Sequence, residues 1–459
     1  MNKLYFIAVL LLITTSCAEH KTRTYDFKQI KETGELNVIT MSSSTSYFIY
    51  KDEAMGYDYD LVKQFCDYHG LKLNIKVAEN STRLLQMLEN GEGDLIASAV
   101  TVQNELKDSI IYCGLEQISH QVLVQRTGKR DSMVTDVVQL IGKEVYVKHD
   151  TKYHRRLLNL DAELGKGILI KDVEKDTITV EDLIGMVARK EINYTVADEY
   201  IAKLNKTYYR NIDVSLPLSF EQRSSWAVRK DTPELADSLN AWFAQNSRKP
   251  IYKDITKKYF ELSKMLDVEY KIPKDLPKGF ITPFDPLFKK YEGVAGYDWL
   301  LLASIAYQES RFKTNLSSWA GAVGLMGLMP RTAASFGAAP EELTNPEVSI
   351  KVGAGLVARL NDIFKRVPGE EQRLKFVLAA YNGGNGHIAD AQALARKYGD
   401  DPYKWDGSVE KYIELKSKPE YYTDSVCKNG YLRGSEVVNY VNQVTKNWNK
   451  FRDMYEKGK

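Results

Sequence analysis

The 459-residue chain lacks the features that identify several broad classes of protein. Its 63 Lys and Arg are balanced by 61 Asp and Glu, so a net charge of +2 provides no overall field for holding nucleic acid. No segment after Ile13 is apolar enough to span a bilayer. His is rare, and no Cys–His spacing is typical of a metal site, so we expect neither a metal nor another cofactor.

Cysteine is also scarce, with only four residues. The first, Cys17, ends the segment MNKLYFIAVLLLITTSC, which has a Lys near its start and an apolar run of roughly ten residues, as secretory signals do. Export would leave Cys66, Cys113 and Cys427 in an oxidising compartment. Three thiols permit one disulfide and one free cysteine, and the sequence does not say which two would pair.

The Thr-Thr-Ser-Cys ending resembles the lipobox of bacterial lipoproteins, which implies that residues 1–17 are a lipoprotein signal peptide ending at Cys17, and that Cys17 becomes the lipidated first residue after cleavage. Thr14 stands where that pattern prefers Leu, and an ordinary cleaved signal with a chance Cys is the alternative. Ala18 follows where lipoproteins retained in the inner membrane often carry Asp, so outer-membrane attachment facing the periplasm is favoured. The polar residues 18–32 would form a tether.

The remaining chain has the length of two or three domains and changes character once. Residues 33–268 alternate strand-like and helix-like segments, which favours parallel sheets covered on both faces. Residues 269–289 are rich in Pro and are interpreted as a stiff linker. Residues 290–459 read as helix after helix with Gly-containing loops, so a mostly α domain is expected.

Five segments of the α/β region are similar in order to periplasmic solute-binding proteins of the amino-acid-binding type. They are TSYFIYKDEAMGYDYDLVKQF, GEGDLIASAVTV, LIGKEVYVKHDTKYHRRLLNL, INYTVADEYIA and SSWAVRKDTPEL. The resemblance implies two lobes that close over a ligand. Lobe 1 would be residues 33–115 and 217–265, and lobe 2 would be residues 116–216.

The same resemblance assigns a regulatory ligand site. Tyr47, Phe48 and the loop at Thr101 would line the cleft from lobe 1, and Thr151 and Asp198 would face them from lobe 2. Asp198 matches the carboxylate that pairs with a ligand ammonium. Leu106 stands where the family usually has an Arg for the ligand carboxylate, which disfavours a free amino acid and leaves a peptide or muropeptide. A scaffold that binds nothing is the alternative.

Four motifs in the helical region resemble, in order, the catalytic domain of soluble-type lytic transglycosylases, a lysozyme-like α fold. They are Glu309-Ser310 after an apolar run, GAVGLMGLMP at 321–330, AYNGG at 380–384, and EVVNYV at 436–441. Together with the first domain, they resemble the F type of membrane-bound lytic transglycosylases, which act on the glycan strands of peptidoglycan.

Glu309 has the setting that glycosidic bond cleavage requires. An acid must protonate the leaving oxygen, but a free Glu with a pKa of about 4.3 is ionised at neutral pH. The apolar residues before Glu309, and Leu325, Met326 and Met329 after it, would favour its neutral form by burial. No second acid lies near Glu309 in the sequence; Asp362, Asp390 and Glu436 are remote.

The resemblance resolves the missing second acid, because the family uses one Glu as acid and then as base. That Glu protonates the bond after MurNAc and then deprotonates the MurNAc 6-hydroxyl, which closes a 1,6-anhydro ring in a lyase reaction. The resemblance assigns this role to Glu309 and substrate contacts, or positioning of Glu309, to six other residues: Ser310, Leu325, Met326, Tyr381, Asn382 and Tyr440. The alternatives are that Met326 belongs to the core instead of the cleft wall, and that Tyr381 only packs at a helix end. Glu436 is interpreted as a structural partner.

Gly327 departs from the family pattern, which commonly has Gln at this position. We expect weakened sugar contacts with retained chemistry, and a Gln there should change affinity more than turnover. Two alternatives to an enzyme regulated by a cell-wall ligand remain. One is a sensor or scaffold lipoprotein whose catalytic domain is inactive; the other is a transporter's solute receptor, which leaves the helical domain without a purpose.

Overall fold

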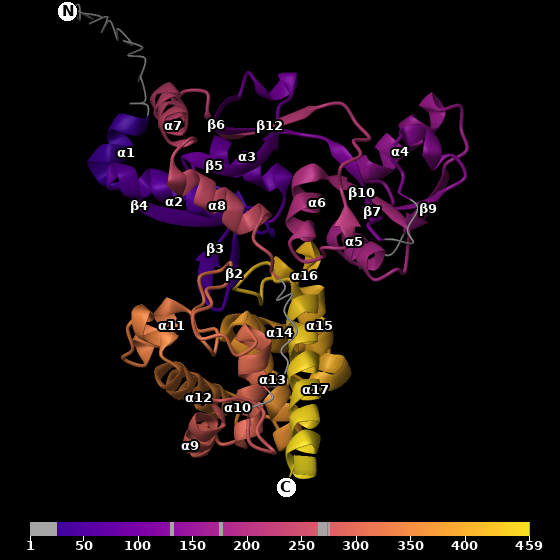
Figure 1. Ribbon diagram of the computed structural model, residues 1–459. Coiled ribbons are helices and arrows are strands. Elements are labelled where there is room, and N and C mark those ends of the chain that lie inside the picture. The colour runs from indigo at the N-terminus through magenta and orange to yellow at the C-terminus, as the bar shows by residue number, and fades with distance from the viewer. Residues whose placement is uncertain (1–24, 129–132, 174–177, 265–272, 274–275, 459) are drawn as a thin grey trace, which may run out of the picture.

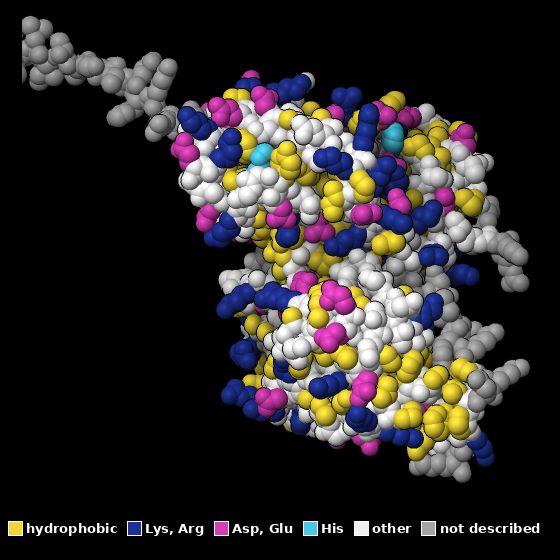
Figure 2. All heavy atoms as spheres, turned by 60° about the vertical axis from the view of Figure 1, so that its left-hand side comes forward, with side chains coloured by type: hydrophobic (Ala, Val, Ile, Leu, Met, Phe, Trp, Pro, Cys, Tyr) yellow, Lys and Arg dark blue, Asp and Glu magenta, His cyan; other side chains and the backbone are white. Residues whose placement is uncertain are grey.

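The structure is a computed structural model that describes residues 25–128, 133–173, 178–264, 273 and 276–458. The predicted signal and the Cys17 lipidation site lie outside these residues. An upper α/β part and a lower helical part meet at a narrower waist (Figures 1 and 2). The division into a two-lobed α/β domain and a mostly α domain therefore agrees with the sequence prediction.

Lobe 1 is built on a five-stranded sheet of order β4-β1-β5-β12-β6. Its interior strands are almost fully buried because helices cover both faces of the sheet. The strands are β1 (Glu35–Met41), β4 (Lys72–Ala78), β5 (Leu95–Thr101), β6 (Ile110–Ser119) and β12 (Gln222–Arg229). The helices are α1 (Phe27–Thr33), α2 (Tyr57–His69), α3 (Ser81–Glu89), α7 (Pro233–Asn246) and α8 (Pro250–Phe260).

Lobe 2 has its own five-stranded sheet, of order β11-β7-β10-β8-β9. The strands are β7 (Gln121–Arg126), β8 (Glu144–Lys148), β9 (Leu169–Val173), β10 (Tyr194–Asp198) and β11 (Ile212–Asp213). The helices are α4 (Lys152–Glu163), α5 (Val180–Ala188) and α6 (Glu199–Lys206). The chain enters this lobe after β6 and leaves it before β12, close to the predicted lobe boundaries.

Two predictions for this region are wrong in part. The sheets are mixed, because β12 runs antiparallel to β5 and β6, and β7 runs antiparallel to β10. The predicted tether ends before α1, whose Phe27 and Ile30 are buried in the core of lobe 1. Asp26 fixes α1 by accepting the backbone N–H of Phe27 and also those of Glu234 and Leu235 on α7.

The helical domain packs around one central apolar helix, α10 (Trp299–Ser310), which lies against α9 (Asp285–Ala295) and α17 (Gly434–Gly458). Nearly all of α10 is buried, which explains why its sequence is apolar on every side. The other helices are α11 (Pro330–Ser335), α12 (Pro346–Ile363), α13 (Glu370–Gly383), α14 (Asn385–Lys397), α15 (Glu410–Leu415) and α16 (Pro419–Tyr422). Ile281 already belongs to this core, so the domain begins before the predicted end of the linker.

A hairpin leaves lobe 1 and reaches down to the helical domain (Figure 1). It consists of β2 (Phe48–Tyr50) and β3 (Glu53–Met55), which pair only with each other. Its two-residue turn, Lys51-Asp52, has φ values of 49° and 61°. Positive φ at both positions is typical of a type I′ turn, which usually carries Asn or Gly. A Lys at the tip therefore adopts an unfavourable backbone conformation, which indicates that its side chain has a role.

Candidate active site and the hairpin that covers it

Glu309 lies in the last turn of α10, where the buried helix reaches the interface between the two domains. The helix ends at Arg311, which has a left-handed φ of 52°. Tyr440 on α17 donates a hydrogen bond of 2.9 Å to Glu309 Oε1. Two of the predicted site residues, which are 131 positions apart in the chain, are thus brought into direct contact.

Lys51 at the hairpin tip is bonded to the carboxylate of Glu309. Its Nζ lies 3.2 Å from both carboxylate oxygens of Glu309 and donates a further bond of 3.0 Å to the carbonyl oxygen of Gly327. The two side chains are only 7% and 11% exposed. Both oxygens that would exchange a proton with the substrate are therefore bonded to an ammonium from the other domain.

The rest of the hairpin tip is fitted to the start of α14. The Asp52 carboxylate accepts the backbone N–H groups of Asn385 and Gly386, each at 3.2 Å, as an acidic residue does at a helix N-terminus. A side chain at Gly384 would lie 2.8 Å from the Asp52 backbone nitrogen. Gly384, the second glycine of the YNGG motif, therefore lets the hairpin backbone approach.

His387 holds the next part of the hairpin. Its Nε2 lies 2.9 Å from the carbonyl oxygen of Ile49, so Nε2 carries the proton. Its Nδ1 is buried and has no hydrogen-bond partner. Burial and the nearby Lys416 ammonium lower the pKa of His387 to about 3.

Some of the residues predicted to contact the substrate line a pocket, and others hold the loop beside Glu309 in place. Ser310, Leu325 and Met326 are fully buried, which favours the positioning role for Ser310 and a core position for Met326. Contact of these residues with a substrate stays a prediction. Ser310 donates to the carbonyl oxygen of Leu325 at 2.8 Å, and Tyr381 donates to that of Met326 at 2.7 Å. These bonds fix the loop after Glu309 against α10 and α13, which positions the carboxylate.

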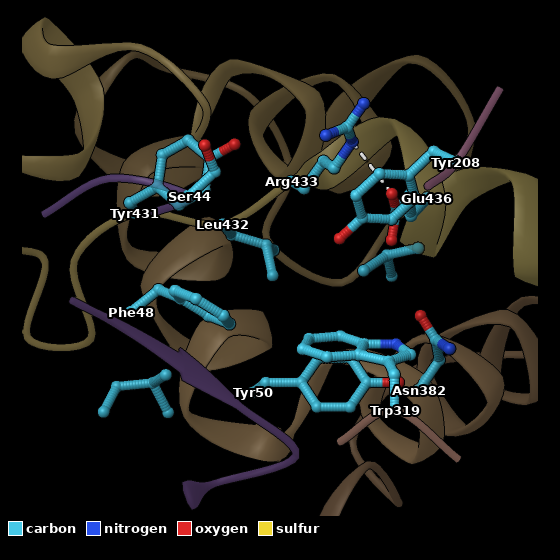
Figure 3. A pocket seen from close by; sticks show the side chains of 13 residues that line it. Ser44, Phe48, Tyr50, Tyr208, Trp319, Asn382, Tyr431, Leu432, Arg433 and Glu436 are labelled. Atoms are coloured by element: carbon cyan, nitrogen blue, oxygen red, sulfur yellow. Dashed lines mark ion pairs between the residues drawn. The ribbon is translucent and has the colours of Figure 1, made fainter. Parts of the chain in front are cut away.

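Asn382 lines a pocket between the domains, with aromatic walls from both (Figure 3). Tyr50 and Phe48 of the hairpin lie against Trp319 of the helical domain, with ring centroids 5.5 Å and 6.5 Å apart. Lys264 covers Trp319, with its Nζ 4.5 Å from the ring centroid. Phe48 therefore belongs to this interface and does not line the cleft between the lobes, contrary to the prediction.

The backbone of Gly327 lies directly against the side chain of Glu309. Its φ is +59°, and an added Cβ would lie 2.1 Å from Glu309 Oε2 and 2.9 Å from Glu309 Cβ. Any side chain there would have to displace the carboxylate. That a Gln at this position would affect affinity more than turnover stays a prediction, and this contact with Glu309 argues that turnover would change as well.

Burial controls the ionisation of the groups around the site. It raises the pKa of Tyr381 and of Tyr440 well above its usual range, and the Glu309 carboxylate adds to both shifts. Both phenols therefore remain donors. Glu436 is buried one turn before Tyr440, and its pKa rises to about 7 for the same reason.

Glu436 is a structural partner, as its sequence context indicates. Its Oε1 lies 2.8 Å from Arg433 Nε, an ion pair that lacks hydrogen-bond geometry. None of the carboxylates in the described residues shares a hydrogen-bond partner with Glu309. The structure thus offers a single carboxylate at this position.

The predicted regulatory carboxylate is also paired with a lysine. Asp198, at the end of β10, accepts Lys152 Nζ at 2.6 Å and the Tyr153 hydroxyl at 3.0 Å. Thr151 is the N-cap of α4, so it sets the direction of the turn that carries both partners. Tyr47 packs against Tyr59, and Thr101 ends β5 in an exposed position. That these residues form one ligand site stays a prediction.

Another carboxylate, Glu181 on α5, contacts three parts of the molecule, and no pattern in the sequence around it indicates this. It accepts hydrogen bonds from Ser44 in lobe 1 and from Tyr431 in the helical domain, the latter at 2.8 Å. Arg433 Nη1 lies 3.4 Å from it, and Arg433 Nη2 donates to Asn205 on α6 at 2.6 Å. Lobe 2 is therefore tied both to lobe 1 and to the helical domain.

The three described cysteines, Cys66, Cys113 and Cys427, are free thiols, so the disulfide that the sequence permits is not formed among them. Cys66 and Cys113 are buried, and burial raises the pKa of each to about 12. Within the described residues, no helix combines the length and apolar character needed to cross a membrane. One cluster of possible metal ligands is described: His149, His154 and Asp172.

Comparison with known proteins gives the same two parts. Residues 36–262 match the bacterial extracellular solute-binding proteins of family 3, and residues 286–404 match the transglycosylase SLT domain. The class is thus a solute-binding domain joined to a transglycosylase domain. Tyr440 lies beyond the second match, on α17.

Whole-chain relatives specify this class further. The chain is 33% identical to a membrane-bound lytic murein transglycosylase F of Desulfosudis oleivorans, with 92% of each chain covered. It is 30% identical to the protein of the same name in Pseudomonas putida, over 96% of this chain and 89% of that one. The chain belongs to the membrane-bound lytic murein transglycosylase F family.

Proposed function

We propose that this chain is a lytic transglycosylase of peptidoglycan in which Glu309 is both the acid and the base, and in which the solute-binding domain controls access to Glu309. The observation that carries the proposal is a lone carboxylate at the end of a buried helix, oriented by Tyr440 and faced by a glycine loop. A single acid suits a reaction whose nucleophile belongs to the substrate.

The reaction would proceed in two proton transfers. Glu309 first gives its proton to the oxygen of the MurNAc-β-1,4-GlcNAc bond, and the bond from that oxygen to C1 of MurNAc breaks. The MurNAc 6-hydroxyl oxygen then bonds to C1 and returns its proton to Glu309. Water is not consumed, and the products are a GlcNAc 4-hydroxyl and a 1,6-anhydroMurNAc end. Tyr440 would keep Oε1 oriented through both transfers.

The docked hairpin is the inactive arrangement in this proposal. Lys51 is bonded to both oxygens of Glu309, and Phe48 and Tyr50 fill the space beside Trp319 and Asn382. A glycan strand could reach Glu309 only after the hairpin withdraws. The protein therefore needs a second state, and a ligand can favour it by binding that state more tightly.

The lobes provide a route for such a ligand to act. Closure of lobe 2 on lobe 1 would move Glu181, which is bonded to both Ser44 and the Tyr431–Arg433 segment. The ligand we expect is a peptide or muropeptide, because Leu106 offers no charge to a free carboxylate and Lys152 already neutralises Asp198. A ligand without a free ammonium would leave that ion pair intact.

Catalysis is tested by mass spectrometry of purified peptidoglycan digested by the full chain. The parent for this test should be Lys51→Asn, because Asn is favoured in a type I′ turn and leaves Glu309 uncovered. Anhydro ends are expected, and Glu309→Gln in the same background should abolish them. Reducing ends would indicate hydrolysis. No product from the parent would favour the alternative, a sensor lipoprotein with an inactive helical domain.

Regulation is tested separately by adding anhydromuropeptides to the wild-type chain and to Lys51→Asn. The ligand should stimulate the wild type, and it should add little to the variant, whose active site is already uncovered. Equal stimulation of both proteins would contradict control through the hairpin while leaving the catalytic proposal intact. A free amino acid serves as the negative control.

We also propose that a lipid on Cys17 anchors the chain to the outer membrane, facing the periplasm. The sequence at residues 14–18 and the names of the relatives support attachment to a membrane. Cys17→Ser should move the protein from the membrane fraction to the soluble fraction after cell breakage, and Ala18→Asp should shift it toward the inner membrane. Retention of Cys17→Ser in the membrane fraction would contradict lipid anchoring.

A further inference from the structure

Lobe 2 brings together two histidines and an aspartate that belong to three different elements. His149 directly follows β8, His154 lies in the first turn of α4, and Asp172 is on β9, the neighbouring parallel strand. His149 Nδ1 lies 2.7 Å from Asp172 Oδ2, and His154 Nε2 lies 3.4 Å from Asp172 Oδ1. The two imidazole centroids are 5.3 Å apart.

From this geometry we infer that His149, His154 and Asp172 form a binding site for Zn²⁺ or a similar divalent transition metal. Two imidazoles and a carboxylate are typical ligands of Zn²⁺, at metal–ligand distances of about 2.0–2.2 Å. Two ligand atoms on one tetrahedral ion are then about 3.4 Å apart. The two separations between Asp172 and the imidazole nitrogens, 2.7 and 3.4 Å, are within 0.7 Å of this value. The three ligand atoms all lie within 4.8 Å of one another, so side-chain rotations would bring them onto one ion.

The surroundings leave room for an ion to enter. The His149 side chain is 55% exposed and that of Asp172 34%, whereas that of His154 is only 13% exposed. The cluster is thus anchored on one buried side and open to water on the other. Three protein ligands with water in the fourth position is a coordination that Zn²⁺ commonly adopts.

One hydrogen bond must change when the metal binds. The backbone N–H of Asp150 donates to His154 Nδ1 at 3.3 Å, so Nε2 of the neutral ring carries the proton and faces Asp172. An ion on Nε2 requires the tautomer with its proton on Nδ1. The bond that is lost is long, and Asp150 is exposed, so water can take its place at the backbone N–H.

The site lies next to the proposed regulatory carboxylate. Lys152 and Tyr153, which hold Asp198, belong to the same first turn of α4 as His154. An ion joining His154 to Asp172 would fix this turn to the edge strand β9. The inference concerns a binding site apart from the active site, and it does not rest on the proposed enzymatic function.

The test is titration of the full chain with ZnCl₂ by isothermal titration calorimetry, in mild detergent and with a histidine-free affinity tag. Cys427→Ser is the background, because Cys427 is the only described thiol that is not buried. We expect one Zn²⁺ per chain. His149→Gln, His154→Gln and Asp172→Asn should each weaken binding by at least about tenfold.

A matched control is His69→Gln, which removes a partly exposed histidine from lobe 1 and should leave the affinity unchanged. Co²⁺ gives a second readout, since its visible absorption distinguishes tetrahedral from octahedral coordination. His149→Gln guards against loss of folding, because its side chain is half-exposed. No binding by the parent, or binding equally strong in the three cluster variants, would overturn the inference and leave the cluster a hydrogen-bonded triad.

Discussion

Two carboxylates that are expected to bind ligands, Glu309 and Asp198, are each occupied by a lysine of the chain itself. Lys51 reaches Glu309 from the other domain, and the side chains of this pair are 7% and 11% exposed. Lys152 reaches Asp198 from the same lobe, and its side chain is 49% exposed. The first pair joins two domains, and the second is local.

The difference determines what is needed to free each carboxylate. A half-exposed lysine can rotate into water, and such pairs contribute about 0–1 kcal/mol. Lys51 cannot leave Glu309 unless the whole hairpin withdraws, with the contacts of Asp52 and His387 broken as well. A ligand can therefore compete for Asp198 directly, whereas Glu309 becomes free only through a movement between domains.

The largest expected effect comes from the position of Glu309 itself. In the Lys51→Asn background, Gly327→Ala should lower kcat by about a hundredfold, because a Cβ 2.1 Å from Oε2 displaces the carboxylate by an ångström or more. Gly321→Ala is the matched control. Its φ of +89° imposes similar backbone strain, but nothing lies within 4 Å of its added Cβ. Equal losses in both variants would mean that strain, not the contact with Glu309, is responsible.

The next effect tests the interdomain pair. Lys51→Asn should raise the peptidoglycan cleavage rate of the full chain at least about tenfold. Removing one partner of a buried ion pair costs about 3–5 kcal/mol. Because this ion pair forms only when the hairpin is docked, the substitution destabilises the docked state and favours the uncovered one. Lys63→Asn, which removes an exposed lysine of lobe 1, should leave the rate unchanged. An unchanged rate for Lys51→Asn would show that the hairpin does not limit access.

A smaller effect is expected at Asp52. Asp52→Gly keeps a residue suited to positive φ but removes two bonds to the start of α14, which are together worth about 1 kcal/mol. The cleavage rate should rise about fivefold. Asp52→Asn can still accept those bonds and should give a smaller increase. A larger increase with Asn than with Gly would contradict the capping explanation.

The sequence predicted the parts of this site that depend on local chemistry. Glu309 is recognisable from the four family motifs in order, and the apolar run before it gives a physical reason for an acid at that position. The alternation of strand-like and helix-like segments, followed by helices alone, predicts the two domains because hydrophobic periodicity is a local property.

The sequence could not predict contacts made between distant elements. Nothing in the segment around Lys51 indicates that its ammonium lies on Glu309, 258 positions away. A hairpin inside a region resembling a solute-binding protein was interpreted as part of the ligand cleft, so Phe48 was misplaced. The family resemblance assigns Leu325 and Met326 to the cleft, but the motif alone does not distinguish a cleft wall from the core, where both side chains lie. The positive φ values of Lys51 and Asp52, visible only in the structure, provide the missing signal.

The smallest expected effect concerns pH, and it tests whether the hairpin contact at His387 contributes to docking. In the docked state Nε2 bonds to Ile49, and Nδ1 is buried beside Lys416, so burial and that charge hold the pKa of His387 at about 3. Undocking would expose the ring, and its pKa would rise toward the ordinary value of about 6.5. The undocked state therefore binds a proton that the docked state does not.

Docking should accordingly be strongest above pH 6.5 and weaken as the pH falls below it. Between pH 7.5 and 5.5 we expect docking to weaken by about threefold, below the tenfold limit for full exposure, because Lys416 stays near the ring in both states. Hydrogen–deuterium exchange of residues 46–56 measures it. His387→Gln, which can still donate to Ile49 but does not titrate, should lose this dependence. Comparing the two proteins at the same pH cancels the intrinsic effect of pH on exchange. An identical pH dependence in both would mean that His387 remains buried when the hairpin moves, and that Lys51 and Asp52 alone hold it.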